Sequence, residues 1–191
     1  EADRLSIEEG MTYVSPFDNV DVIAGQGTLG LEIYKQVPEI NFAFVPLSGG
    51  GLICGVAKAL KGLNPNIKVI GVSMDRGAAM YESQKAGKPI FVKEEESLAD
   101  ALTGGIGLDN KHTFDLTKEL VDDIVLVSEK EIARGIHHAY WNESQIVEGA
   151  GAVTIASLLH KKFKTKGSSI ALMCGRNINI DKHFSLISAK Y

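Results

Sequence analysis

The chain has 191 residues, of which 45% are hydrophobic and 23% are charged, a composition typical of a soluble domain with a sizeable core. A formal net charge of −4, without a dense cluster of Lys and Arg, argues against nucleic acid as a partner. No apolar stretch approaches the roughly 20 residues that cross a bilayer, and no signal peptide is recognisable, so we expect no membrane partner.

The first forty residues predict two helices and a short strand. Residues 1–10 resemble the end of a helix that Gly10 terminates, and no initiator Met precedes them, so we expect a piece of a longer protein. Met11–Val14 is a candidate strand. Residues 28–37 are expected to form a helix that ends before Pro38.

The middle of the chain alternates strands and helices. Residues 42–47 form a continuous apolar run typical of a buried strand, and residues 52–60 then have helical character. Residues 67–73 predict a second strand, which is followed by a helix to about Ala86.

The second half of the chain begins irregularly and then resumes the alternation. Residues 89–108 have no clear period, and we interpret their acidic run as a solvated surface. Further elements are predicted as a strand at 124–127, a helix from a Ser128/Glu131 capping box to Glu143, a helix at 148–163 and a strand at 169–173. The pattern predicts an α/β fold, a parallel, doubly wound sheet with helices on both faces, in one domain spanning residues 1–191.

A turn of consecutive glycines, Ser48–Leu52, joins the first buried strand to its helix. Glycines let backbone N–H groups converge on one centre, and the helix dipole adds partial positive charge, so the turn predicts an anion site, usually for phosphate. The alternative is a plain glycine turn without a ligand. Ligands of open α/β sheets bind beyond the carboxyl ends of the strands, where Cys174–Asn177 is also expected. The two segments are therefore candidates to line one site.

The two cysteines, Cys54 and Cys174, lie far apart in apolar segments, which favours a reducing cytoplasm over a disulfide framework. We interpret Cys54 as a core residue. His137 and His138 are adjacent and would diverge on a helix, and no other His or Cys group has the spacing of metal ligands. These patterns predict a cytoplasmic protein without a metal site.

Five motifs stand out along the chain: Ala-Gly-Gln-Gly-Thr (24–28), Val-Pro-Leu-Ser-Gly-Gly-Gly-Leu (45–52), Leu-Ala-Asp (98–100), Glu-Gly-Ala-Gly-Ala (148–152) and Cys-Gly-Arg-Asn (174–177). In order and spacing they resemble those of threonine dehydratases and serine racemases, fold-type-II enzymes that use pyridoxal 5'-phosphate (PLP). Together with residues 104–110, the variant motifs are most similar to the hydroxyectoine-utilisation dehydratases. The resemblance implies the cofactor-binding large domain of a homodimeric enzyme that acts on a small amino acid.

The resemblance also implies roles for particular residues. In these enzymes the glycine turn binds the cofactor phosphate, and a Ser or Thr after the last strand faces the pyridine nitrogen. Here Cys174 takes the second position, and the cofactor role is favoured over the alternative, a small buried residue that packs as a hydrophobe. A neutral partner at the ring nitrogen favours β-elimination. The cofactor-binding residues implied are Ser48, Gly49, Gly50, Gly51, Leu52 and Cys174.

Several positions depart from the family pattern. Metal-binding members carry acidic residues where this chain has Ser73 and Ala79, so we expect no metal there. Ala101 replaces a motif glycine. Glu148 is expected to cap a helix, with an indirect role at the site as the alternative. Arg176 could favour a second substrate carboxylate or form a surface salt bridge.

The family's Schiff-base lysine, and the Asn-containing loop that holds the substrate carboxylate, have no counterpart in the chain. We expect Lys58 and Lys61 to face solvent instead, so the catalytic residues stay unknown. The chain thus resembles the C-terminal part of such an enzyme, inactive by itself.

The resemblance implies a PLP-dependent ammonia-lyase that converts a β-hydroxy amino acid to a keto acid and ammonia. Threonine, serine and 3-hydroxyaspartate are the candidate substrates. An amino-acid racemase of the same fold and a non-catalytic homologue are alternatives. A third alternative, an NAD(P)-binding oxidoreductase module, is suggested by the spacing of Gly49, Gly51, Gly55 and Asp75.

Overall fold

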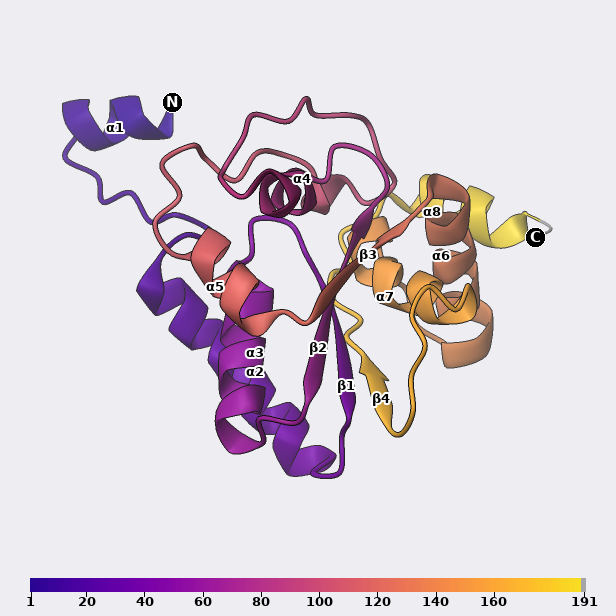
Figure 1. Ribbon diagram of the computed structural model, residues 1–191. Coiled ribbons are helices and arrows are strands. Elements are labelled where there is room, and N and C mark those ends of the chain that lie inside the picture. The colour runs from indigo at the N-terminus through magenta and orange to yellow at the C-terminus, as the bar shows by residue number, and fades with distance from the viewer. Residues whose placement is uncertain (190–191) are drawn as a thin grey trace.

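The computed structural model describes residues 1–189, in which a four-stranded parallel sheet separates two groups of helices (Figure 1). All of its strand pairings are parallel, and the spatial order is β3-β2-β1-β4. The strands are β1 (Phe42–Pro46), β2 (Lys68–Met74), β3 (Asp123–Val127) and β4 (Ser169–Ala171). The predicted doubly wound α/β sheet is confirmed.

Helices cover both faces of the sheet, and α1 (Ala2–Glu8) lies apart from it (Figure 1). On one face, α3 (Gly51–Leu63) lies against β1, and α2 (Val20–Gln36) and α5 (Thr113–Leu120) pack on α3. Helix α4 (Ala79–Ala86) packs on α5. On the other face, α7 (Gly149–Leu159) lies against all four strands, α6 (Glu129–Glu143) packs on α7, and α8 (Ile180–Ser188) packs on α6. A 3₁₀ turn, η1 (Asp100–Leu102), also contacts α7. No helix within residues 1–189 combines the length and the apolar character that a bilayer span requires.

Two apolar clusters, one on each side of the sheet, make up the core. Strand β1 contributes to both because successive side chains of a strand point to opposite faces. Phe44 packs with the α6–α7 cluster, whereas Ala43 and Val45 pack with the α2–α3 cluster, and all three are fully buried. This two-sided burial explains the uninterrupted apolar sequence of the strand.

The pairing of β1 with β4 brings two distant parts of the chain together. The register runs from Phe42 opposite Ser169 to Phe44 opposite Ala171. Beyond β4 the Leu172 N–H still donates to the Phe44 carbonyl oxygen at 3.0 Å. Because the two strands are parallel neighbours, the segments that follow them leave the sheet at the same edge.

The predicted strand at Met11–Val14 is wrong. Residues 1–189 contain no strand paired with this segment, and the side chains of Met11, Tyr13 and Val14 are exposed. A β-strand requires a neighbouring strand to pair with its N–H and C=O groups, so the local sequence pattern of this segment is not sufficient to form one.

The helix predicted from residue 28 begins eight residues earlier, at Val20. Asn19 caps it, because its side-chain oxygen accepts hydrogen bonds from the N–H groups of Asp21 and Val22 at 2.8 and 3.2 Å. Glycine allows α2 and α3 to cross at close range. A Cβ atom on Gly55 would lie 2.2 Å from the Ile23 carbonyl oxygen.

Two helices, α5 and α8, were not predicted, and two elements are shorter than expected. Asn179 caps α8 by accepting hydrogen bonds from the backbone at 2.9 and 3.0 Å. Helix α7 ends at Leu159 rather than at residue 163, because Lys161 adopts a left-handed conformation with φ of +50°. Strand β4 ends at Ala171, two residues early.

Candidate functional site

A cavity of about 390 Å³ opens at the carboxyl end of β1. We call it the glycine-turn cavity. Segments that lie far apart in the sequence contribute to its wall: residues 16–17, 46, 48–52, 101–103, 105, 148, 150 and 174. All six residues expected to bind a cofactor, residues 48–52 and Cys174, therefore line the same cavity.

The conformation of the turn requires glycine. Gly50 forms the N-cap of α3 with φ of +96°, a region that other residues rarely adopt. A Cβ atom on Gly49 would lie 2.4 Å from the ring of Phe17, and one on Gly51 would lie 2.8 Å from the Phe17 Cα atom. The turn therefore has its shape because Phe17 lies directly against the main chain.

The backbone N–H groups of residues 48–53 form no hydrogen bond with any acceptor in residues 1–189. The first paired amide of α3 belongs to Cys54, which donates to the Gly50 carbonyl oxygen at 2.9 Å. The Ser48 hydroxyl group likewise has no partner in the described part of the chain. Unpaired donors at the positive end of a helix, beside a cavity, match the requirements of a phosphate group.

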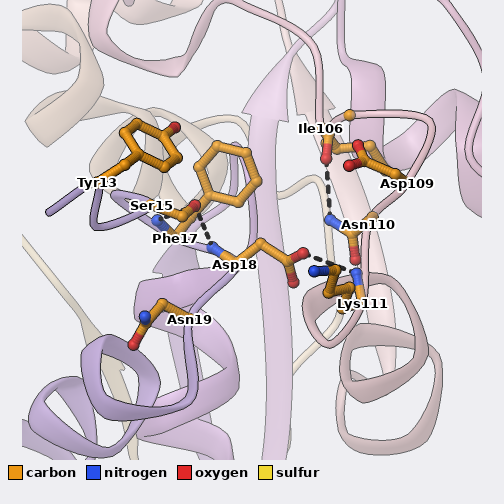
Figure 2. A pocket seen from close by; sticks show the side chains of 10 residues that line it. Tyr13, Ser15, Phe17, Asp18, Asn19, Ile106, Asp109, Asn110 and Lys111 are labelled. Atoms are coloured by element: carbon orange, nitrogen blue, oxygen red, sulfur yellow. Dashed lines mark hydrogen bonds between the residues drawn. The ribbon is translucent and has the colours of Figure 1, made fainter. Parts of the chain in front are cut away.

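A second cavity, of about 430 Å³, lies between residues 13–19 and 106–111 (Figure 2). Several polar side chains in its wall hold the surrounding loops together. The Asn110 amide nitrogen donates to the Ile106 carbonyl oxygen at 2.9 Å, and the Asn110 side-chain oxygen accepts from the Phe114 N–H at 2.8 Å. Phe17 lines both this cavity and the glycine-turn cavity.

Asp18 links the two loops and positions Phe17. Its carboxylate accepts hydrogen bonds from the N–H groups of Lys111, His112 and Thr113 at 2.7, 2.8 and 3.0 Å, and Figure 2 shows it directed at Lys111. Burial raises the pKa of the Asp18 carboxyl group, but the three backbone donors outweigh burial and hold this pKa below its usual value. Asp18 thereby caps α5 and fixes the neighbouring Phe17 over the glycine turn.

Cys174 lies in the wall of the same cavity, in a partly buried position. Burial raises the pKa of its thiol, and the negative charge of Glu148 raises it further. The thiol therefore remains protonated at neutral pH. Helix α7 packs closely on this segment, since a Cβ atom on Gly151 would lie 1.8 Å from the Cys174 carbonyl oxygen.

The predicted capping role of the Glu148 side chain is wrong. Glu148 occupies the N-cap position of α7, but its carboxylate accepts a hydrogen bond from the Asn177 N–H at 2.9 Å instead of capping the helix. Arg176 donates to the Gln145 side-chain oxygen at 2.8 Å. It forms no salt bridge within residues 1–189, contrary to one of its two predicted roles.

Lys58 and Lys61 do not line the glycine-turn cavity. Lys58 is exposed, as expected. The expectation is wrong for Lys61, whose side chain is only 20% exposed and forms an ion pair with Asp122 at 2.7 Å. Cys54 is fully buried, as predicted, and its sulfur lies 3.4 Å from the Thr117 hydroxyl oxygen.

The glycine spacing that suggested a nicotinamide site has a structural explanation. Gly55 is required by the contact of α3 with α2, and Asp75 does not line the cavity. Ser73 is buried and Ala79 begins α4. No group of three or more His, Cys, Asp and Glu residues within 1–189 has an arrangement that could hold a metal ion.

Comparisons with known proteins place this cavity in context. The sequence profile described as "Pyridoxal-phosphate dependent enzyme" matches residues 1–175. A Sinorhizobium fredii protein named "Putative threonine dehydratase" is 52% identical over 189 residues, which are 98% of this chain and 57% of that protein. The L-threonine ammonia-lyase of Thermotoga maritima is 39% identical over 179 residues, 93% of this chain and 44% of that enzyme.

A solved structure has the same fold over nearly the whole chain. Maize serine racemase superimposes with a TM-score of 0.87 at 32% identity, over 96% of this chain and 56% of the racemase. The chain therefore spans about half the length of the curated relatives and of the structure that it matches.

Proposed function

The chain belongs to the pyridoxal-phosphate-dependent enzymes, and we propose that it carries the cofactor-binding large domain of an ammonia-lyase acting on threonine. The names of the relatives from S. fredii and T. maritima support threonine as the substrate and ammonia release as the reaction. Serine and 3-hydroxyaspartate are further candidate substrates, because they share the hydroxyl group on the β-carbon. We also propose a homodimeric, cytoplasmic protein.

The residues of the glycine-turn cavity fit PLP. The unpaired N–H groups of residues 48–53 are suitable donors for a doubly charged phosphate, and the glycines leave the main chain accessible. Cys174 offers a neutral donor on the same cavity wall. This combination of an anion-binding turn and a protonated thiol in one cavity is the observation that carries the proposal.

The glycine turn and Cys174 have separate tasks in this proposal. The turn holds the phosphate and so fixes the position of the cofactor, with the Ser48 hydroxyl as an additional donor. Cys174 would offer its S–H group as a hydrogen-bond donor to the cofactor ring, since its raised pKa keeps the thiol protonated. When bound, the PLP ring stabilises the negative charge that remains after the α-proton of an amino acid is removed.

The experiment is performed on the whole protein with PLP. We expect PLP to bind with a visible absorption band, and threonine to be converted to its keto acid and ammonium in equal amounts. Serine and 3-hydroxyaspartate are assayed in parallel. A protein that does not bind PLP, or one that binds PLP and releases no ammonium from any of the three amino acids, would refute the proposal.

The likeness to maize serine racemase supports a second candidate activity, the racemisation of serine. Chiral chromatography of serine incubated with the PLP-loaded protein distinguishes the two. Interconversion of L- and D-serine faster than ammonium release would favour the racemase. Ammonium release without D-serine would favour the lyase.

A further inference from the structure

Glu148 is bound to the segment that carries Cys174 by both its main chain and its side chain. The Glu148 N–H donates to the Gly175 carbonyl oxygen at 3.2 Å. The Glu148 carboxylate accepts the Asn177 N–H at 2.9 Å. One residue at the start of α7 thus holds both sides of the turn formed by residues 174–177.

The space around this turn is closely filled. Gly175 has φ of +79°, and a Cβ atom there would lie 2.2 Å from the second carboxylate oxygen of Glu148. On the other side, the Cys174 carbonyl oxygen lies against Gly151 of α7. The carboxylate and the helix therefore leave the Cys174 backbone little freedom to move.

Glu148 is also the only charged residue among those that line the glycine-turn cavity in the described part of the chain. Its charge acts on the Cys174 thiol in the same direction as burial, so both disfavour the thiolate. A thiolate could not donate a hydrogen bond to an unprotonated ring nitrogen. The carboxylate therefore has an electrostatic effect in addition to its geometric one.

We propose that Glu148 is the positioning residue for Cys174: its carboxylate holds the turn at residues 174–177 so that the thiol faces the cofactor ring as a hydrogen-bond donor. This inference rests on the proposed function, because it takes PLP as the occupant of the cavity. Glu148 itself needs no contact with the cofactor or with the substrate.

Two substitutions separate the geometric effect from the electrostatic one. E148Q removes the charge but keeps an oxygen that can accept the Asn177 N–H, whereas E148A removes both. The matched control is E39A, because Glu39 is an exposed carboxylate outside the cavity. Circular dichroism and thermal melting of each variant of the whole protein establish that it is folded.

The first measurement needs no cofactor. The whole protein is alkylated with iodoacetamide between pH 6 and 10, and mass spectrometry of its peptides gives the rate at Cys174. Because the thiolate is the reactive form, E148Q and E148A should both react roughly 3- to 10-fold faster than wild type near pH 8. E39A should match wild type, and fully buried Cys54 should remain unlabelled in all four proteins.

The second measurement is PLP affinity and the absorption spectrum of bound PLP across the same pH range. E148A should raise the dissociation constant about 10-fold, and E148Q should restore it to within about threefold of wild type. The pH at which the absorption spectrum of bound PLP changes should be lower in both variants than in wild type. If wild type binds PLP but both variants have unchanged alkylation rates and unchanged spectra, the role of Glu148 is overturned and the proposed function is upheld. Absence of PLP binding by wild type would overturn both.

Discussion

The left-handed conformation of Gly50 provides a direct test of the glycine turn. In the G50A variant, the new methyl group must adopt φ of +96° and would lie 2.9 Å from the Thr113 Cβ atom. Holding a residue other than glycine in such a conformation costs about 1–3 kcal/mol. The turn can relieve this strain by rotating its peptide groups, which would direct the N–H donors of residues 48–52 away from the phosphate.

If the full cost is expressed in binding, the dissociation constant for PLP rises roughly 5- to 140-fold, since about 1.4 kcal/mol corresponds to a factor of 10. Fluorescence titration of the whole protein with PLP measures this change. G62A is the control, because Gly62 lies in α3 with open space around its Cβ position and should bind PLP as wild type does. A G50A protein that is folded and binds PLP within twofold of wild type would refute the reasoning.

Three further predictions concern stability. G55A should lower the free energy of unfolding by about 1–3 kcal/mol in urea denaturation, because its Cβ atom would collide with α2, whereas G25A, with open space, should not lower it. D122N should lower it by about 1–3 kcal/mol at pH 7, where Asp122 accepts hydrogen bonds from Lys61, Lys68 and the Val69 N–H. Burial raises the pKa of the Asp122 carboxyl group, but these donors lower it below its usual value, so their stabilising effect is present above the ordinary value of about 4. The difference between wild type and D122N should therefore shrink as pH falls through the lower folded-state pKa; a difference that is constant from pH 7 to 3 would contradict this assignment.

Local sequence signals predicted those parts of the fold that depend on local chemistry. The capping box at the start of α6 is confirmed, with the Ser128 hydroxyl and the Glu131 carboxylate each bound to the other residue's N–H. The strands at 42–47, 67–73 and 124–127 are confirmed to within one residue at each end, because a strand buried on both faces is recognisable from its apolar run alone.

Other parts depend on tertiary contacts that a local pattern does not contain. Helix α5 is capped by the Asp18 carboxylate, and Asp18 precedes Lys111, the first residue whose N–H it binds, by 93 positions in the sequence. The bond between Glu148 and the Asn177 N–H spans 29 positions and replaces the expected helix cap. Phe17 was missed for a similar reason, since a single aromatic residue in a loop gives no signal until its contact with the glycine turn is known.

The edge of the sheet at which the cavity lies could be predicted, because ligands of parallel sheets bind beyond the carboxyl ends of the strands, where the segments after β1 and β4 meet. The sequence suggested that residues 48–52 and Cys174 lie there, and the cavity includes all of them. Which of them contact a cofactor remains a prediction.

The donors of the glycine turn belong to peptide groups, which do not titrate in the physiological range. An enzyme built on this turn should grip the phosphate equally well from mildly acidic to mildly alkaline conditions, apart from the ionisation of the phosphate itself. The Cys174 thiol of the same cavity also keeps its proton under these conditions, because burial and the negative charge of Glu148 raise its pKa. The hydrogen-bond donors that the cavity offers would therefore be constant across this pH range.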